Sequence, residues 1–181
     1  MIARLTSYRT RPDELQLLLD EIVAVARARS RWPVEQPNRR AELFFVDTAS
    51  GDGLSLVVGD YRTVRPVIEL ARSPSKGPEE YDVHLLQVGG PRGSGVVQAL
   101  YGRIVRCDPG AVSDLSFDGD AVPTSPDVWT RALLVAPDRR VLAFAVGPDR
   151  GALEESLVKF SSRSAHVDDY DEVAYHFFLD R

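Results

Sequence analysis

Cysteine and lysine are scarce in this chain. Cys107 is the only cysteine among 181 residues, so no internal disulfide bond and no cysteine-rich metal site can form. A chain of this kind needs no oxidising compartment, and we expect a cytoplasmic protein. Lys76 and Lys159 are the only lysines among 22 basic residues, a bias that we attribute to the high-GC genome of an actinobacterium.

Long apolar runs and an excess of positive charge are also lacking. No apolar stretch approaches the roughly 18 residues that span a bilayer, and the first 13 residues include three arginines, so we expect neither a membrane span nor a signal peptide. The net charge of −5 leaves no basic surface to neutralise phosphates, which argues against a nucleic-acid partner. Hydrophobic residues nevertheless make up 44% of the chain, enough to bury a core.

The first half carries the pattern of a β-α-β-β-α-β unit. Pro12, Asp13 and Glu14 suit the first turn of a helix, and apolar residues at three- and four-residue spacing follow them. Two β-rich runs flank Gly51 and Gly53, which can adopt the positive φ of a hairpin turn. The expected elements are a strand at 2–9, a helix opening at 12, strands at 42–48 and 54–62, a short helix at 64–72 and a strand at 81–88.

The second half repeats the first after a glycine-rich connector. The matching segments are the strand-to-proline turns 8–13 and 105–110, the hairpin strands 56–62 and 143–150, and the closing strands 81–86 and 173–178. We therefore predict repeat 1 at 1–90, a linker at 91–95 and repeat 2 at 96–181. In repeat 2 the first helix is shortened, because 111–128 is rich in Asp, Pro, Ser and Thr, and the second helix, 151–164, is longer.

The opening strand Met1-Ile2-Ala3-Arg4, the strand-to-proline turn, the hairpin and the closing strand resemble the antibiotic-biosynthesis-monooxygenase-like group of the dimeric α+β barrel superfamily. The resemblance covers nearly the whole chain, once per half. In that group two chains pair their sheets into a barrel. The resemblance thus implies an α+β fold of two tandem ferredoxin-like repeats, with antiparallel sheets forming one intramolecular barrel, in a monomer or a homodimer.

The same resemblance indicates which cofactors can be expected. Haem-degrading relatives use an Asn, a Trp and a His, whereas this chain has Ser7 and Tyr8 in its first strand and Asp60 and Tyr61 after its hairpin. The short helix at 64–72 contains no histidine either. We therefore expect no haem and no other cofactor.

Two histidines are candidates for catalysis, because a histidine titrates near neutral pH and can act as a general base. His84 and His176 each precede two large apolar residues in the predicted closing strands, which places them at matching positions of the two repeats. The alternative is that each is a hydrogen-bonded histidine on a half-buried strand. Without a nearby carboxylate the pair makes a poor metal site, and we expect no metal. The acidic run 168–172 is interpreted as a solvated loop.

Aromatic and cationic residues alternate on two strands. Trp129 and Arg131 share one strand face, and Tyr101 and Arg103 share another. Such a combination suits a small aromatic or anionic ligand, and the predicted ligand-binding residues are Tyr8, Tyr61, Tyr101, Arg103, Trp129 and Arg131. The competing interpretation is that the arginines reach solvent while the rings pack in the core.

Three functions remain after these exclusions. The preferred one is a small-molecule-binding α+β barrel without established catalysis. The first alternative is a cofactor-independent monooxygenase, an oxidoreductase that acts on an aromatic or polyketide-like substrate. The second alternative is a protein-interaction module, which would have a filled barrel and no ligand-induced stabilisation.

Overall fold

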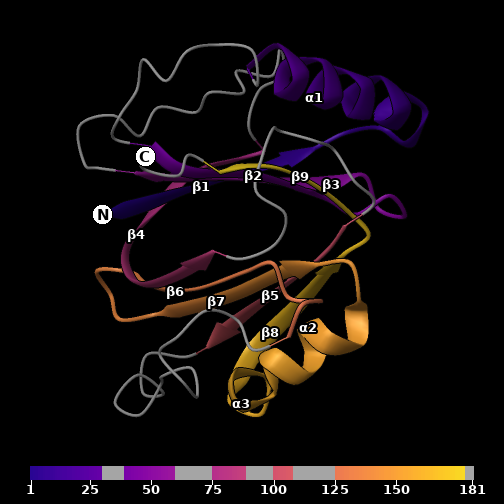
Figure 1. The fold of residues 1–181 in the computed structure, drawn as a ribbon. Helices are drawn as coiled ribbons and strands as arrows, with labels where there is room; N and C mark the ends of the chain where they lie inside the picture. Colours follow the sequence, from indigo (N-terminus) through magenta and orange to yellow (C-terminus); the bar gives the residue numbers. More distant parts are fainter. Residues whose placement is uncertain (30–38, 60–74, 89–99, 108–124, 178–181) are drawn as a thin grey trace. The chain divides into compact units, whose positions relative to one another are not determined.

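The structure is a computed structural model, and it describes residues 1–29, 39–59, 75–88, 100–107 and 125–177. It has a mixed α+β fold with few helices, and its nine strands form an antiparallel sheet in the order β8-β5-β7-β6-β4-β1-β3-β2-β9 (Figure 1). The strands are β1 (Ile2–Arg9), β2 (Arg39–Val46), β3 (Asp52–Gly59), β4 (Lys76–Val88), β5 (Tyr101–Cys107), β6 (Thr130–Val135), β7 (Val141–Gly147), β8 (Ser164–Tyr170) and β9 (Glu172–Phe177). The helices are η1 (Pro12–Glu14), α1 (Leu15–Arg29), α2 (Arg150–Ser156) and α3 (Val158–Ser161).

The chain divides into two compact units. Unit 1 comprises Met1–Glu80, Gly93–Ala99 and Asp171–Arg181, and unit 2 comprises Tyr81–Arg92 and Leu100–Tyr170. The predicted short helix at 64–72, the linker at 91–95 and most of the segment 111–128 lie outside the described residues. Among those described, no helix combines the length and apolarity needed to cross a membrane.

In unit 1 the helix α1 covers one face of the sheet (Figure 1). Its buried Leu18 packs with Tyr8, Phe44 and Val46 of the strands, and Leu15 and Leu19 extend the cluster. These leucines recur at three- and four-residue spacing, as the sequence predicted, so one helical stripe faces the strands. The β1 prediction is confirmed at both ends, Ile2 and Arg9.

The β2–β3 hairpin turns through a network that demands glycine at one position. Asp47 accepts hydrogen bonds from the Ala49 amide at 3.0 Å and the Ser50 hydroxyl at 2.6 Å. The Ser50 bond is the main reason that the pKa of Asp47 lies below its usual value. Gly51 adopts φ 75°, and a Cβ there would lie 2.6 Å from the Thr10 carbonyl oxygen. Only glycine fits both the conformation and the space.

In unit 2 the helices α2 and α3 cover one face of the sheet (Figure 1). The Asp149 side chain caps α2 by accepting a hydrogen bond from the Ala152 amide at 2.8 Å. The single helix predicted at 151–164 is found as two short helices separated at Leu157, and it ends at Ser161 because Ser164 already belongs to β8. The buried core beneath these helices consists of Val105, Cys107, Val128, Leu133, Val141, Ala143, Ala145, Leu153, Leu157 and Phe160.

The acidic run 168–172 is strand rather than loop, which corrects the prediction. Asp168 and Asp169 lie in β8, and Glu172 opens β9. Asp171 separates the two strands, and its carboxylate accepts hydrogen bonds from the Thr48 amide at 2.7 Å and from the Thr48 hydroxyl. Asp168 and Asp169 pair with Arg106 and Arg103 of the neighbouring strand β5, partners that the sequence alone does not show.

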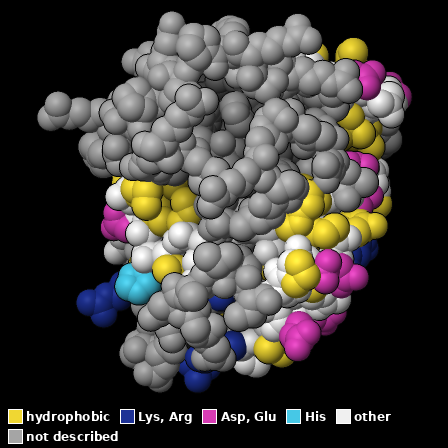
Figure 2. Space-filling model, viewed as in Figure 1, with side chains coloured by type: hydrophobic (Ala, Val, Ile, Leu, Met, Phe, Trp, Pro, Cys, Tyr) yellow, Lys and Arg dark blue, Asp and Glu magenta, His cyan; other side chains and the backbone are white. Residues whose placement is uncertain are grey.

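Charged side chains of both signs lie at the surface in the view of Figure 2. The large apolar side chains that are exposed within the described ranges are Met1, Leu17 and Val158. They are scattered singly, which is normal for a folded domain.

Candidate functional site

The predicted ligand-binding residues of unit 2 share the sheet face that α2 and α3 cover. Tyr101 lies opposite Gly147 in the β5–β7 register, and Arg103 lies opposite Ala145. On the other side of β7, Arg131 also lies opposite Ala145. The structure therefore brings the two predicted aromatic–cationic pairs to one face, on either side of β7.

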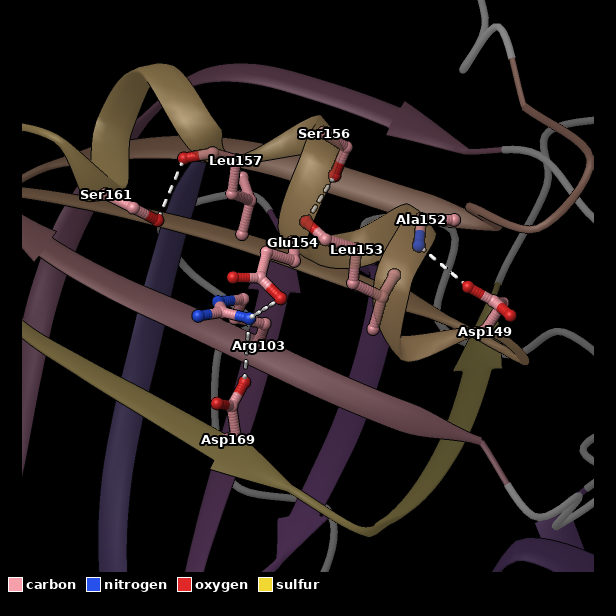
Figure 3. A network of polar contacts seen from close by, with 9 residues as sticks. All are labelled: Arg103, Asp149, Ala152, Leu153, Glu154, Ser156, Leu157, Ser161 and Asp169. Atoms are coloured by element: carbon pink, nitrogen blue, oxygen red, sulfur yellow. Dashed lines mark hydrogen bonds and ion pairs between the residues drawn. The ribbon is translucent and has the colours of Figure 1, made fainter.

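Arg103 and Tyr101 have structural partners there. The Arg103 guanidinium lies 3.6 Å from Glu154 of α2 and 3.6 Å from Asp169 of β8, and Figure 3 shows both contacts. The guanidinium carbon of Arg150 lies 4.5 Å from the centre of the Tyr101 ring. These contacts attach α2 to the sheet. The expectation that the arginines reach solvent is wrong for Arg103, whose side chain is only 15% exposed.

Arg131 is buried and contacts a residue that the sequence analysis did not select. Its Nε–H donates to the Oε1 atom of Gln87, the residue opposite it in the β4–β6 register. The Nε2 atom of Gln87 is buried and has no hydrogen-bond partner within the described part of the chain. Trp129, immediately before β6, is also buried, and its backbone amide donates to the Val146 carbonyl at 2.8 Å.

On the helix-covered face of unit 1, polar side chains form a row along β1. Arg4, Thr6 and Tyr8 alternate along β1, and Ser55 of β3 lies opposite Thr6. Thr6, Tyr8 and Ser55 are all buried, and the Ser55 hydroxyl has no partner among the described residues. Burial raises the pKa of Tyr8, so its phenol stays neutral and can donate a hydrogen bond. Arg4 pairs with Glu80 of β4 at 2.5 Å.

The helix-covered face of unit 2 also carries Arg103, Arg131 and Gln87, but two of its central positions on β5 and β7 are apolar. Gly59 lies opposite Ile2 in unit 1, and Gly147 lies opposite Tyr101 in unit 2. Counting along the strands from these glycines puts Val105 and Ala143 where unit 1 has Thr6 and Ser55. Those two residues belong to the core beneath α2 and α3. Unit 1 therefore has two hydroxyl side chains at places where unit 2 has apolar side chains.

The two candidate catalytic histidines differ in their strand pairing. His84 is exposed and lies at a bulge that the β4–β6 register skips, whereas His176 lies opposite Glu42 of β2. The bulge takes His84 out of the β4–β6 register, whereas His176 keeps a partner in its own register, so the matching of the two histidines stays a prediction. The side chains of His176 and Tyr61 lie outside the described residues, so their roles stay predictions.

A third histidine, which the sequence analysis missed, belongs to a charged cluster on the opposite face of unit 2. The Nε2 atom of His166 lies 2.7 Å from Asp168, whose other oxygen pairs with Arg106. This cluster connects the neighbouring strands β5 and β8. The cluster was missed because the acidic run 168–172 was interpreted as a loop, whereas Asp168 lies in strand β8. No group of three or more metal-ligating side chains occurs in the ranges that the structure covers.

No family model and no curated protein matches the sequence. A solved candidate monooxygenase from Lactobacillus acidophilus matches with a TM-score of 0.65 at 9% identity, covering 96% of this chain and 92% of that one. A candidate monooxygenase from Fusobacterium nucleatum gives 0.57 at 10% identity, covering 99% and 96%. A major regulator of staphylococcal pathogenesis gives 0.50 at 13% identity, covering 96% and 98%.

These likenesses extend over nearly the whole of each chain. At identities near 10% they show the fold alone. The chain therefore shares the α+β fold of these proteins.

Proposed function

We propose that the chain binds a small molecule on the helix-covered face of unit 1. The observation that carries the proposal is the buried Ser55 hydroxyl, which has no partner within the described ranges and lies opposite the buried Thr6. A buried polar group without a partner costs about 1–3 kcal/mol. Unit 2 avoids this cost with Val105 and Ala143 at the matching places. A bound ligand would supply the missing hydrogen bond in unit 1.

The residues of this face define the class of ligand. Tyr8, Thr6 and Ser55 offer hydroxyl groups that can donate to an acceptor oxygen. Arg4, whose charge is paired with Glu80, adds further N–H donors at the edge of the row. The neighbouring Phe44 ring, whose centroid is 6.0 Å from that of Tyr8, provides an apolar aromatic wall. These groups suit a small aromatic or anionic compound with oxygen substituents.

Replacing both hydroxyl residues by their unit 2 counterparts tests the proposal. The double variant Thr6→Val, Ser55→Ala should keep or raise the melting temperature of the free protein, since it removes a buried unpartnered hydroxyl. It should lose the thermal shift that wild type shows with its best ligand from a panel of aromatic acids, polyketide quinols and haem. Ser7→Ala, on β1 but on the other sheet face, is the control. A full shift in the double variant would refute the site.

A catalytic role is the second candidate, and the likeness to two candidate monooxygenases favours it. The base would be His176, which lies opposite Glu42 in the β2–β9 register and on the strand beside the proposed site. We expect oxygen uptake with a bound polyketide quinol to fall about 100-fold in His176→Asn, the typical contribution of a general base. His84→Asn, at the exposed bulge, should be unaffected. Equal activity in all three proteins would remove His176 from the mechanism.

We also propose that the units are repeats of one ferredoxin-like motif. The strand order β4-β1-β3-β2 in unit 1 corresponds to β8-β5-β7-β6 in unit 2. Arg4 and Arg103 occupy matching places, and each pairs with an acid on the fourth strand, Glu80 and Asp169. Each arginine also has a buried Nε atom without a partner in the described residues. Two such coincidences support duplication and divergence.

The sheet faces that the helices leave uncovered support an intramolecular barrel. In unit 1 that face carries Leu5 and Leu56, and in unit 2 it carries Ile104 and Phe144, all with at most 2% exposed. The charged cluster of Arg106, Asp168 and His166 lies on the same face of unit 2 as Ile104, but the four apolar side chains still need a covering layer. We propose that each sheet covers the other, as in the family's dimers, with the single chain supplying the high effective concentration.

A further inference from the structure

The amide of Gln87 in unit 2 is held in one orientation. Gln87 and Arg131 lie opposite each other in the β4–β6 register, and each is only 6% exposed. The Nε–H of Arg131 donates to Oε1 of Gln87. Turning the amide over would set its NH₂ group against the Arg131 N–H, two donors without an acceptor. The Arg131 bond therefore fixes which end of the amide is the donor.

That donor end is unsatisfied. The Nε2 atom of Gln87 carries two N–H groups and is buried, with no acceptor in the residues the structure describes. Native proteins satisfy nearly all such groups with protein, water or ligand atoms. The bond from Arg131 also polarises the amide and strengthens its remaining donors. Gln87 is thus a hydrogen-bond donor of fixed orientation that lacks an acceptor among the described residues.

The surroundings specify what the acceptor belongs to. Trp129 precedes Arg131 by two residues, so strand alternation puts it on the same face, and it is 9% exposed. Arg103, two strands away in the same row, already contacts Glu154 and Asp169 (Figure 3). The positive charge of Arg131 lies directly beside the amide. An ionised carboxylate on a planar ring would match the amide donors, the charge and the indole surface.

We propose that Gln87, positioned by Arg131 and flanked by Trp129, binds the carboxylate of an aromatic acid on unit 2. This site is separate from the one proposed on unit 1. It depends on a different unpartnered group and different strands, so either site can exist without the other.

Binding of 2-naphthoate to the full chain tests the proposal, with 2-naphthamide as the neutral probe of equal shape. At about 100 times its Kd, 2-naphthoate should raise the melting temperature of wild type by roughly 5–10 °C, and the amide should raise it less. Gln87→Glu keeps an oxygen for the Arg131 Nε–H but sets a negative charge against the ligand. Calorimetry should show its affinity for 2-naphthoate at least about tenfold weaker.

Two further variants complete the test. Gln87→Met removes the donor without adding charge and should lose 2-naphthoate binding as well, which covers the case that Gln87→Glu fails to fold. Ser7→Ala, on unit 1 but on the sheet face that carries neither proposed site, should retain it. A wild type that does not respond to 2-naphthoate, or Gln87 variants that bind it normally, would overturn the proposal. Binding that is lost only in the Thr6→Val, Ser55→Ala protein would place the ligand on unit 1 and leave that proposal standing.

Discussion

Replacing Gly147 with alanine should destabilise the protein by about 3 kcal/mol or more, the upper range for forcing an extra methyl group into a filled space. A Cβ at this position would lie 1.9 Å from the Asp127 carbonyl oxygen and 3.2 Å from the Val128 Cα. Both neighbours are backbone atoms, so no side-chain rotation relieves the clash. The 125–129 segment would have to move away from the end of β7.

That movement has further consequences in unit 2. Val128 packs in the core beneath α2 and α3, and the Trp129 amide donates to the Val146 carbonyl. Displacing the segment would weaken both contacts. For a chain of this size the melting temperature should fall by roughly 6–12 °C, measurable by circular dichroism.

Gly151→Ala is the matched control for this variant. Gly151 is exposed in the first turn of α2, and a Cβ there would meet only the Asp149 carboxylate, 3.2 Å away and able to adjust. Alanine favours helix over glycine by about 0.5–1 kcal/mol, so stability should hold or rise slightly. Equal stability of the Gly147 and Gly151 variants would show that Asp127 does not lie over β7 as described.

The local elements could be predicted because their signals are local. The spacing of the leucines in α1, the glycine of the β2–β3 turn and the proline before the first helix act within a few residues of themselves. Each was expected in the place where it occurs. The missed strand β8 differs, because Asp168 and Asp169 are stabilised in a strand by Arg106 and Arg103 of its neighbour β5.

The candidate sites depend on which residues of neighbouring strands lie opposite each other. The sequence alone gives little information on that register. Alternation predicted that Trp129 and Arg131 share a face, and this needed no knowledge of the neighbouring strand. Gln87 was missed because its importance comes from lying opposite Arg131, and the bulge at His84 decides that pairing. Ser55 and Thr6 were missed for the same reason, since small hydroxyl residues attract notice only when they are seen to be buried together.

Phe44→Ala should lower the stability of the protein by about 3–5 kcal/mol, the usual cost of removing a buried phenyl ring. Phe44 is 1% exposed and packs with Tyr8 and Leu18. Its ring lies 3.3 Å from where a Cβ of Gly53 would be, so that glycine makes room for it. Because the ring connects α1 to the sheet, hydrogen exchange should speed up most across α1. Leu17→Ala, 65% exposed on the same helix, should change stability by less than about 0.5 kcal/mol.

The shape of the unfolding curve of Phe44→Ala tests the proposed barrel as well. If the helix-free faces of the two units form one core, a cavity in unit 1 must lower the stability of both units together. Calorimetry should then show one transition, at a lower temperature, with equal calorimetric and van't Hoff enthalpies. Units with separate cores would behave differently, since unit 2 would melt at its original temperature while unit 1 melted earlier. Two transitions would therefore reject the shared core, while a loss under about 1 kcal/mol would reject the packing of Phe44 against α1.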